Sequence, residues 1–427
     1  MPTQEERLLE LSEGIGEARL AREEKRHLAP WAPVYAPRVY DERLNLYNAH
    51  AENSRQIAAG RARARNGGNM HGLFLWDSTG VGTGAAGVTA TERKSVPKQL
   101  QRLVSEALNV PIAGGISPAT AASGLRSDRW SGTGAITAFY AFLTSGQTHI
   151  YTTLHKGPNV DLYISELGSA GTYSIDGEAP VNIAVGNGTN TVRKISRTGL
   201  SDTTHVITFT GSGGAGTWLL VLGGEVWSPH GTRFHNLSMG GSRAGGASDA
   251  LNWTDTVSSS AVYGRKRMFD ASGITPDFVC VDLGANDISA ANSTATIIAA
   301  LEVMHDWYPN ADFILSALWE KFDTETDEGI ELMTARYELA KELDCWLFDW
   351  RHRHGDRATA QTAGLLSSDN IHFHDGTGED LAHSMSIPIS GDGPGHPRLV
   401  TQPYASASYS HLPAGTLVAV YDPAGTV

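Results

Sequence analysis

The sequence predicts a three-layer α/β/α core with a parallel β-sheet, interrupted by an all-β sandwich domain and preceded by a helical N-terminal arm. Two observations support the core. Continuous apolar runs recur along the chain, and segments of helical periodicity separate them, as expected for buried strands of a parallel sheet that helices cover on both faces. A third observation, a stretch of short alternating runs rich in Thr, Ser, Gly and Val, indicates the inserted domain.

The composition is that of a globular protein. The chain has 427 residues, of which 41% are hydrophobic and 19% are charged, and this length favours two or more folding units. The formal net charge of -13 argues against nucleic acid as a partner, because phosphate binding requires a basic face. Cys280 and Cys345 each lie in an apolar run, so we expect two buried core residues rather than a disulfide scaffold.

Residues 1–66 are predicted to form the helical arm. Leu8, Leu9 and Leu11 lie among Glu and Arg residues, a pattern suited to an amphipathic helix through which copies of the chain could form a homo-oligomer. A second helix-like stretch at 41–68 ends at a pair of glycines. The arm has no apolar region typical of a secretory signal. Membrane insertion is not expected either, because no apolar run approaches the roughly 20 residues of a span.

The first part of the α/β core is assigned to 67–116. Here the apolar run 72–76 predicts a strand, a Gly-rich turn follows, and the apolar residues from Leu100 to Leu108 have helical spacing. A strand, a turn and a helix in this order are typical of the opening of an α/β layer.

The inserted β-sandwich is assigned to 117–227, where short apolar runs alternate with Gly or Asn turns. Aromatic residues at this spacing are expected in the sandwich core, although exposed rings could stack on sugars and make the insert carbohydrate-binding. The aromatic residues in question are Trp130, Tyr140, Tyr151, Tyr163 and Tyr173.

The α/β pattern returns over 228–389, with helices predicted at 293–307 and 326–343. Four strands are predicted in this part, in the runs FHNLSMGG, DFVCVDLGAND, ADFILSALW and DCWLFDW. The last segment, 390–427, is rich in Gly, Pro, Ser and Tyr and is expected to be an irregular or β appendage.

Four polar blocks follow predicted strands or lie in loops near their ends, where open α/β sheets place catalytic groups. They are WDST at 76–79, MGGS at 239–242, GAND at 284–287 and DNIH at 369–372.

The D-x-x-H pair Asp369 and His372 is the most informative of these, although a single match of this kind is more often a surface turn. The carboxylate can orient the imidazole of the same turn, and the imidazole can then take a proton from Ser78. The backbone N–H groups of Ser78 and Gly241 and the amide of Asn286 could surround a developing oxyanion. Each donor of this kind is typically worth about 3–4 kcal/mol.

These blocks resemble those of the SGNH hydrolases, the GDSL-like serine esterases. WDSTGVG is similar to the GDS block, FHNLSMGGS to the glycine block, LGAND to the GxND block and DNIHFHDGTGEDLA to the DxxHxxxxGxxxLA terminal block. All four occur in the family order, and the resemblance covers roughly 67–115 and 228–387. It implies a flavodoxin-like three-layer fold and a reaction that uses no metal and no organic cofactor.

The resemblance implies Ser78 as nucleophile, His372 as general base and Asp369 as the residue that orients it. Gly241 and Asn286 would complete the oxyanion hole, and the spacing from Asn236 favours Gly241 over Gly240.

Trp76 stands where the family usually has Gly, so its indole is expected at the acyl pocket. Trp76 and Arg243 are the expected substrate contacts.

The expected function is hydrolysis of a short-chain acyl ester, on an acylated glycan or a small molecule, through an acyl-Ser78 intermediate. SGNH-type domains with helical arms and β appendages resemble those of phage tail proteins that act on host envelope glycans. The location stays unknown at this point, with a virion and the cytoplasm as the two alternatives that fit the missing secretory signal.

Other assignments were weighed for the same residues. GGSRA approaches the nucleophile elbow of an α/β-hydrolase, with Ser242 as nucleophile, but ends in Ala. Gly82–Gly87 fits G-x-G-x-x-G but lacks the acidic residue that a dinucleotide site has about 20 positions further on. His372, His374 and Asp375 suggest a metal site, although zinc usually takes four regularly spaced ligands, and a solvent-facing His374 is expected instead.

The alternative from another class is a glycan-binding or structural virion or surface protein whose hydrolase-like core is inactive. The presence of all five catalytic-type residues favours the enzyme, and turnover of an ester distinguishes the two.

Overall fold

The structure is a computed structural model that describes most of the chain between Leu46 and Tyr421. The described ranges are 46–49, 52–82, 92–119, 129–133, 135–136, 141–167, 170–189, 191–212, 218–245, 265–289, 291–317, 327–350, 357–368, 371–391, 399–403 and 417–421. The predicted helix around Leu8–Leu11 and most of the predicted C-terminal appendage lie outside the described residues.

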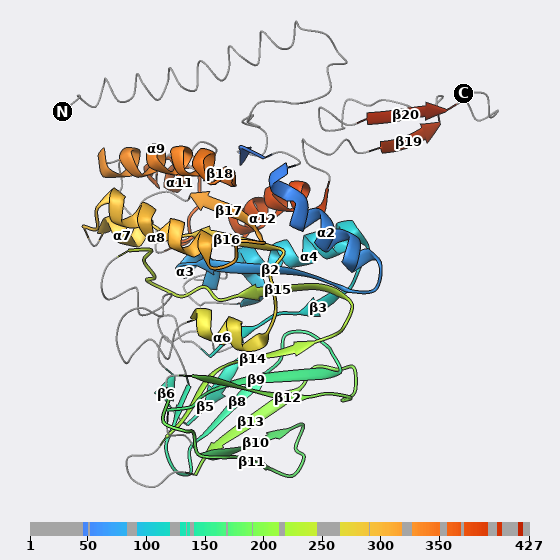
Figure 1. The fold of residues 1–427 in the computed structure, drawn as a ribbon, viewed down its shortest axis with the longest axis vertical. Coiled ribbons are helices and arrows are strands. Elements are labelled where there is room, and N and C mark those ends of the chain that lie inside the picture. The colour runs from blue at the N-terminus through green and yellow to red at the C-terminus, as the bar shows by residue number, and fades with distance from the viewer. Residues whose placement is uncertain are drawn as a thin grey trace, which may run out of the picture.

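A parallel sheet forms the centre of the α/β core (Figure 1). Its strands are β2 (Asn69–Trp76), β3 (Ile112–Gly114), β15 (Gly231–Asn236), β16 (Phe278–Asp282), β17 (Asp312–Ala317) and β18 (Trp346–Asp349). They pair in the order β18-β17-β16-β2-β15-β3, and the short β1 (Leu46–Tyr47) adds antiparallel to β18. Because β15 and β16 lie on opposite sides of β2, the connections diverge at the carboxyl end of β2, where such sheets bind ligands.

Helices cover both faces of this sheet. One face carries α2 (Arg55–Arg65), α4 (Val96–Leu108) and α12 (Asp375–Ser390), and the other carries α6 (Arg265–Ser272), α8 (Thr294–Asp306) and α9 (Asp327–Glu342). Side chains of β2 alternate between the two cores: Phe74 and Trp76 pack toward the first set of helices, Leu73 and Leu75 toward the second. The predicted three-layer fold with a parallel sheet is confirmed.

Helix α4 illustrates how the sequence directs these elements. Leu100, Val104 and Leu108 recur at a spacing of four and are buried, so one stripe of the helix faces the sheet. Pro97 stands in the first turn, where its missing N–H costs nothing, and Asn109 ends the helix with a φ of 55°. The helices predicted at 293–307 and 326–343 are confirmed as α8 and α9.

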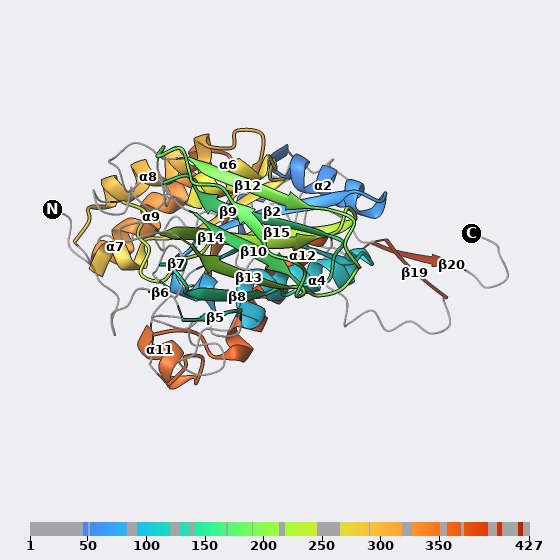
Figure 2. The same cartoon turned by 90° about the horizontal axis from the view of Figure 1, so that it is seen from below.

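The region between β3 and β15 consists of two antiparallel sheets with a shared hydrophobic core. Its strands are β4 (Ser117–Pro118), β5 (Trp130–Gly132), β6 (Ala135–Ile136), β7 (Ala141–Leu143), β8 (Thr148–Thr152), β9 (Asn159–Ser165), β10 (Gly171–Ile175), β11 (Val181–Ile183), β12 (Val192–Arg197), β13 (Val206–Gly211) and β14 (Leu219–Trp227). The first sheet continues the central sheet, because β14 pairs with β3, β4, β7 and β9. The second has the order β11-β10-β13-β8-β5, and Figure 2 shows β10, β13, β8 and β5 side by side.

Four of the five aromatic residues singled out in this region are buried, namely Trp130, Tyr151, Tyr163 and Tyr173, whereas Tyr140 lies outside the described residues. Trp130, Tyr151 and Tyr173 lie in the core shared by the two sheets, which confirms the expectation for these three, but Tyr163 packs into the core beneath α6, α8 and α9. The ring of Trp130 stacks on that of Tyr151 with centroids 4.5 Å apart. These four rings are therefore not available to a sugar.

The N-terminal segment differs from the expectation of a long helix over 41–68. Residues 46–47 form β1, a 3-10 turn follows at Glu52–Ser54, and α2 begins only at Arg55. Ile57 and Ala64 join the hydrophobic core, and Asp312 accepts a hydrogen bond from the Ile57 N–H at 2.6 Å. From Leu46 onward, this segment therefore packs against the α/β core.

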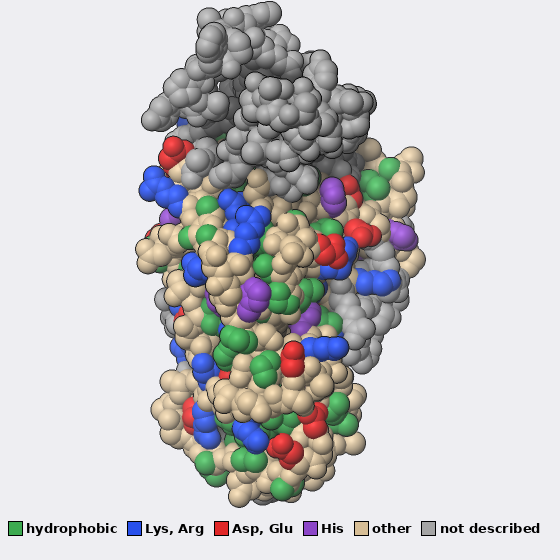
Figure 3. All heavy atoms as spheres, turned by 90° about the vertical axis from the view of Figure 1, so that its right-hand side faces the viewer, with side chains coloured by type: hydrophobic (Ala, Val, Ile, Leu, Met, Phe, Trp, Pro, Cys, Tyr) green, Lys and Arg blue, Asp and Glu red, His purple; other side chains and the backbone are tan. Residues whose placement is uncertain are grey.

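The remaining described elements are short or peripheral. They are α3 (Ser78–Val81), the 3-10 turn Glu92–Lys94, α7 (Ala285–Ser289), α11 (Arg357–Thr362), and the parallel pair β19 (Leu399–Pro403) and β20 (Leu417–Tyr421). Cys280 and Cys345 are buried free thiols, as expected. None of the helices within the described ranges has the length and apolar character of a membrane span. On the face shown in Figure 3, acidic and basic side chains are interspersed.

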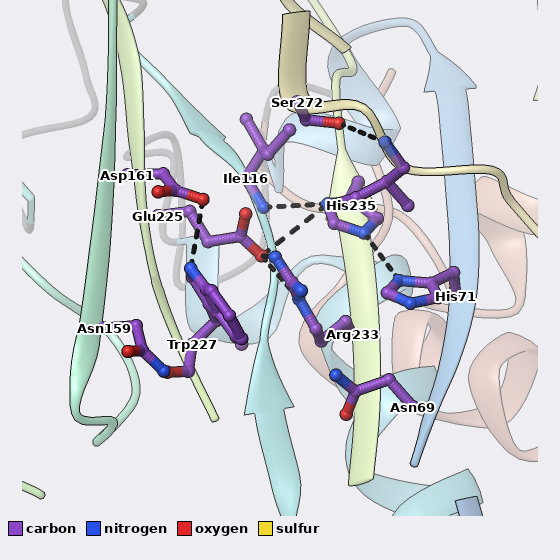
Figure 4. A network of polar contacts seen from close by, with 12 residues as sticks. Asn69, His71, Ile116, Asn159, Asp161, Glu225, Trp227, Arg233, His235 and Ser272 are labelled. Atoms are coloured by element: carbon purple, nitrogen blue, oxygen red, sulfur yellow. Dashed lines mark hydrogen bonds and ion pairs between the residues drawn. The ribbon is translucent and has the colours of Figure 1, made fainter. Parts of the chain in front are cut away.

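A buried ion pair joins the β-rich region to the α/β core (Figure 4). Arg233 of β15 contacts Glu225 of β14 with Nη2 2.8 Å from Oε1, and both side chains are less than a tenth exposed. The guanidinium also lies over the Trp227 ring, and the Trp227 indole donates to Asp161 at 3.0 Å. Burial raises the pKa of Glu225, and the Arg233 charge opposes that shift.

Two stacked histidines continue this contact into the sheet. His235 accepts a hydrogen bond from the Ile116 N–H on Nδ1 at 3.2 Å, and its Nε2 lies 3.4 Å from Nδ1 of His71. Burial lowers the pKa of His235 well below its ordinary value, so the ring is neutral and carries its proton on Nε2. The ring therefore donates toward His71.

We expect Arg233→Met to lower the free energy of unfolding by about 3–5 kcal/mol, because it leaves the Glu225 carboxylate buried without its counter-charge. The matched control is Arg197→Met, which removes the more exposed pair with Glu178 and should change stability little. Urea denaturation followed by tryptophan fluorescence measures both. Equal effects of the two substitutions would contradict this assignment.

Candidate active site

Ser78 lies at the carboxyl end of β2, at the first position of the four-residue helix α3. Asp77 caps this helix: its Oδ1 accepts the Thr79 N–H at 2.9 Å and the Thr79 hydroxyl at 2.8 Å. Gly82 ends the turn with a φ of 92°. The turn therefore holds the Ser78 hydroxyl, which is half-buried, at the edge of the sheet.

Gly80 allows this turn to pack against the next strand. A Cβ at position 80 would collide with the side chains of Trp76 and Ser238, so glycine is required for space. The carbonyl of Gly80 accepts a hydrogen bond from Asn236 Nδ2 at 2.7 Å. Asn236, the last residue of β15, thereby fixes the serine turn relative to the neighbouring strand.

His372 reaches Ser78 from the segment that leads into α12. Leu366 and Phe373 form an antiparallel bridge, and the carbonyl of His372 accepts a hydrogen bond from the Ser367 N–H at 2.7 Å. With its backbone held in this way, His372 places Nε2 2.7 Å from the Ser78 Oγ. This is the separation at which a histidine can take a serine proton.

Gly241 stands in a tight turn that follows β15. The Met239 N–H donates to the Trp76 carbonyl at 3.0 Å, and the Ser242 N–H donates back to the Met239 carbonyl at 3.2 Å. Gly241 has a φ of 73°, and a Cβ there would meet open space, so glycine is required for its conformation rather than for room. This turn thus lies beside the end of β2, on an exposed part of the edge.

Asn286 joins the serine turn to the glycine turn. Its Nδ2 donates to Asp77 Oδ2 and to the Ser242 carbonyl, both at 3.0 Å. Both amide protons are thus engaged in this structure. To donate to an oxyanion, the amide has to share or release one of these bonds.

Two residues of this arrangement, Asp77 and Asn236, were not among the predicted site residues. The sequence gives one signal for Asp77, which is its place beside Ser78 in the WDST block. Asn236 is the last residue of β15, whose sequence GTRFHN is mostly polar, so its polar side chain does not stand out.

The predicted substrate contacts have different outcomes. The Trp76 side chain is fully buried in the core between the sheet and the helices, so the structure does not support a contact with substrate. Arg243 is half-buried and directly follows the glycine turn.

The structure also bears on the alternative assignments for Ser242 and His374. The Ser242 side chain is fully buried, and His372 lies against Ser78 rather than Ser242. His374 is exposed and accepts from the Gly376 N–H at the start of α12, which confirms the solvent-facing expectation. Within the described ranges, no group of three or more His, Cys, Asp or Glu residues is placed to hold a metal ion. Asp369 and the part of the G-x-G-x-x-G stretch from 83 onward lie outside the described residues.

Comparisons with known proteins find the fold but no close relative. No protein-family model and no curated protein matches the sequence. A structure of a peptidoglycan O-acetylesterase superposes with a TM-score of 0.56 at 14% identity, covering 81% of this chain and 98% of that one. The chain has the fold of the SGNH-type hydrolases. The resemblance inferred from the four sequence blocks is thus confirmed at the level of the fold.

Two family-two carbohydrate esterases are more distant. One, with a carbohydrate-binding domain, comes from Corynascus thermopiles (Myceliophthora fergusii), with 16% identity, coverage of 61% and 98%, and a TM-score of 0.27. The other comes from Cellvibrio japonicus, with 11% identity, coverage of 65% and 98%, and a TM-score of 0.27. At these scores, neither carries an argument about this chain.

Proposed function

We propose that this SGNH-fold protein is a serine esterase that hydrolyses acyl esters through an acyl-Ser78 intermediate. The observation that carries the proposal is the 2.7 Å separation between His372 Nε2 and Ser78 Oγ at the carboxyl edge of the parallel sheet. The neighbour that shares the fold is itself an O-acetylesterase, which supports the same chemistry.

Acylation begins when His372 takes the Ser78 proton as Oγ attacks the ester carbonyl carbon. The carbonyl oxygen becomes an oxyanion, which the N–H groups of Ser78 and Gly241 and the amide of Asn286 would stabilise. The tetrahedral intermediate then collapses. The bond to the alcohol breaks, His372 gives its proton to the leaving oxygen, and the acyl group remains on Ser78.

Deacylation repeats these steps with water in place of the alcohol. His372 deprotonates the water, a second oxyanion forms in the same place, and Ser78 leaves with the proton returned by His372. Asp369 would orient the imidazole and stabilise its charged form during both halves.

The proposed substrate is a short-chain acyl ester, such as an acetyl group, on a carbohydrate. The β-rich region supports this substrate, because its first sheet extends the central sheet that carries the site. Strand β14 runs antiparallel to β3, and β3 runs parallel to β15. The start of β14 therefore lies at the same edge as the carboxyl ends of β15 and β2, as the positions of β6 and α3 in Figure 1 also show.

An aromatic pair stands at this start of β14. Trp218 is 38% exposed, and its ring lies against that of Phe142 in β7, with centroids 5.3 Å apart. An exposed indole on the catalytic edge is suited to stacking against a sugar ring of a long substrate. In this proposal the pair binds a part of the glycan several strands away from Ser78.

We expect Ser78→Ala to lower kcat/KM for p-nitrophenyl acetate by about 10³-fold or more, because nothing replaces the nucleophile. Ser242→Ala should retain activity, since Asn286 bonds the Ser242 backbone carbonyl, which the substitution preserves. Loss only in Ser242→Ala would move the nucleophile to that residue. A wild type without turnover on p-nitrophenyl and acetylated-glycan esters would refute the esterase and favour the binding protein.

Activity should fall on acidification, because a protonated His372 cannot accept the Ser78 proton. The pH profile of kcat/KM for p-nitrophenyl acetate measures this effect. His374→Ala should leave the profile unchanged, since that imidazole is exposed and caps α12. A rate that does not fall on acidification would exclude His372 as the base.

Trp218→Ala should lower kcat/KM on an acetylated polysaccharide by about 3- to 10-fold, the range that aromatic contacts of about 0.5–1.5 kcal/mol provide. Activity on p-nitrophenyl acetate should not change, because that ester does not reach β14. Val181→Ala, at an exposed apolar position on β11 of the second sheet, is the matched control. Equal loss on both substrates would show that Trp218 does not act through glycan binding.

A further inference from the structure

Asp287, next to Asn286 in the sequence, forms hydrogen bonds with the segment that follows the Gly241 turn. Its side chain is fully buried. Oδ2 accepts the Ala244 N–H at 2.8 Å, and Oδ1 accepts the Gly245 N–H at 2.7 Å. Asn292 Nδ2 is a third donor to the carboxylate, 3.1 Å from Oδ1, and also donates to the Gly245 carbonyl at 2.8 Å.

Asn286 and Asp287 therefore hold the same loop at two successive points. The amide of Asn286 bonds the Ser242 carbonyl, and the carboxylate of Asp287 accepts the N–H groups of Ala244 and Gly245, two and three residues further along. Oxyanion donors act only when they are aligned within about half an ångström of the developing charge. Asn286 and Gly241 are proposed donors on different elements. The hydrogen bonds from Asn286 and Asp287 to residues 242–245 fix their relative positions.

A buried arginine lies behind Asp287. Burial lowers the pKa of Arg336 in α9, and the charges of Asp282, Asp287 and Asp349 oppose that shift. Its Nη2 donates to the Leu283 carbonyl.

Gly284 admits the Arg336 guanidinium to this place. A Cβ at position 284 would collide with Nη2, and the residue has a φ of 128°. The glycine of the GAND block is therefore required by its backbone conformation, and its missing Cβ leaves room for the Arg336 guanidinium.

We infer that Asp287 is a positioning residue of the oxyanion hole: it fixes the segment after Gly241 against the helix that carries Asn286. This inference rests on the proposed esterase function. It assigns the residue that keeps the Gly241 turn and the Asn286 side chain aligned with each other. Asp287 does not touch the substrate, because all of its hydrogen bonds named above go to the protein itself.

The test is Asp287→Asn, which keeps the shape but replaces one accepting oxygen with an NH₂ group that cannot bind an N–H. Removal of a single oxyanion donor lowers kcat by about 10²–10³-fold, so we expect a loss of about 10- to 100-fold for a misaligned one. KM for p-nitrophenyl acetate should stay within about 3-fold, because the ground-state ester does not use the hole.

A second readout separates positioning from a general loss of stability. A short-chain trifluoromethyl ketone forms a tetrahedral adduct with Ser78 whose oxyanion occupies the hole. Its inhibition constant should rise in Asp287→Asn by the same factor by which kcat/KM falls. Asp349→Asn is the matched control, since it removes another buried carboxylate near Arg336, one that accepts the Tyr337 hydroxyl at 2.6 Å.

The inference is overturned if Asp287→Asn changes kcat and ketone affinity no more than Asp349→Asn does.

If Asp287→Asn does not fold, Asn292→Ala carries the test, because it removes the donor shared by Asp287 and the Gly245 carbonyl. A smaller parallel loss of kcat and ketone affinity supports the inference, and unchanged values overturn it. A wild type that neither turns over the ester nor binds the ketone refutes the proposed function, and the inference with it. An active wild type with an unaffected Asp287→Asn refutes the inference alone.

Discussion

The position of β2 between β15 and β16 is the constraint on which the rest of the structure depends. Its ladder to β15 and its ladder to β16 are both parallel, so the carboxyl ends of all three strands meet at one edge. Each of these ends continues into one of the polar turns of the site. The Ser78, Gly241 and Asn286 turns therefore come together because of strand pairing, before any side-chain contact between them is formed.

Side chains at the same edge then convert neighbouring turns into one rigid unit. Asp77 caps the serine helix with one oxygen and receives Asn286 with the other, and Asn236 ties the carbonyl of Gly80 to β15. Charged-group hydrogen bonds in a buried setting are stronger than those at a surface, and they are costly to leave unmade. The site is thus stiff because its supporting groups are buried.

Periodicity made the α/β core predictable, since buried strands and amphipathic helices have distinct patterns. The run at 278–282 and the stripe Leu100–Leu108 are two clear examples. The secondary structure of residues 41–54 was harder to predict, because short polar segments owe their structure to tertiary contacts. Leu46 becomes a strand only by pairing with β18.

The site was predictable where motif residues mark it, as Ser78 does at the end of β2 and His372 does in the turn before α12. Trp76 shows the limit of that reasoning. Its place in the motif suggested the pocket, but the alternation of β2 turns its side chain into the core. Which face a terminal strand residue occupies depends on the register of the sheet, and a single sequence does not specify that register.

The distance along the chain between Ser78 and His372 has a consequence for synthesis. The two side chains that meet at 2.7 Å are 294 positions apart, and the histidine comes from the segment directly before α12, the last helix of the core. In the proposed mechanism, a ribosome-bound chain that has already completed β2 still lacks its base. Such a chain would not react with esters until nearly the whole core has emerged and docked, so that its reactivity would report complete folding.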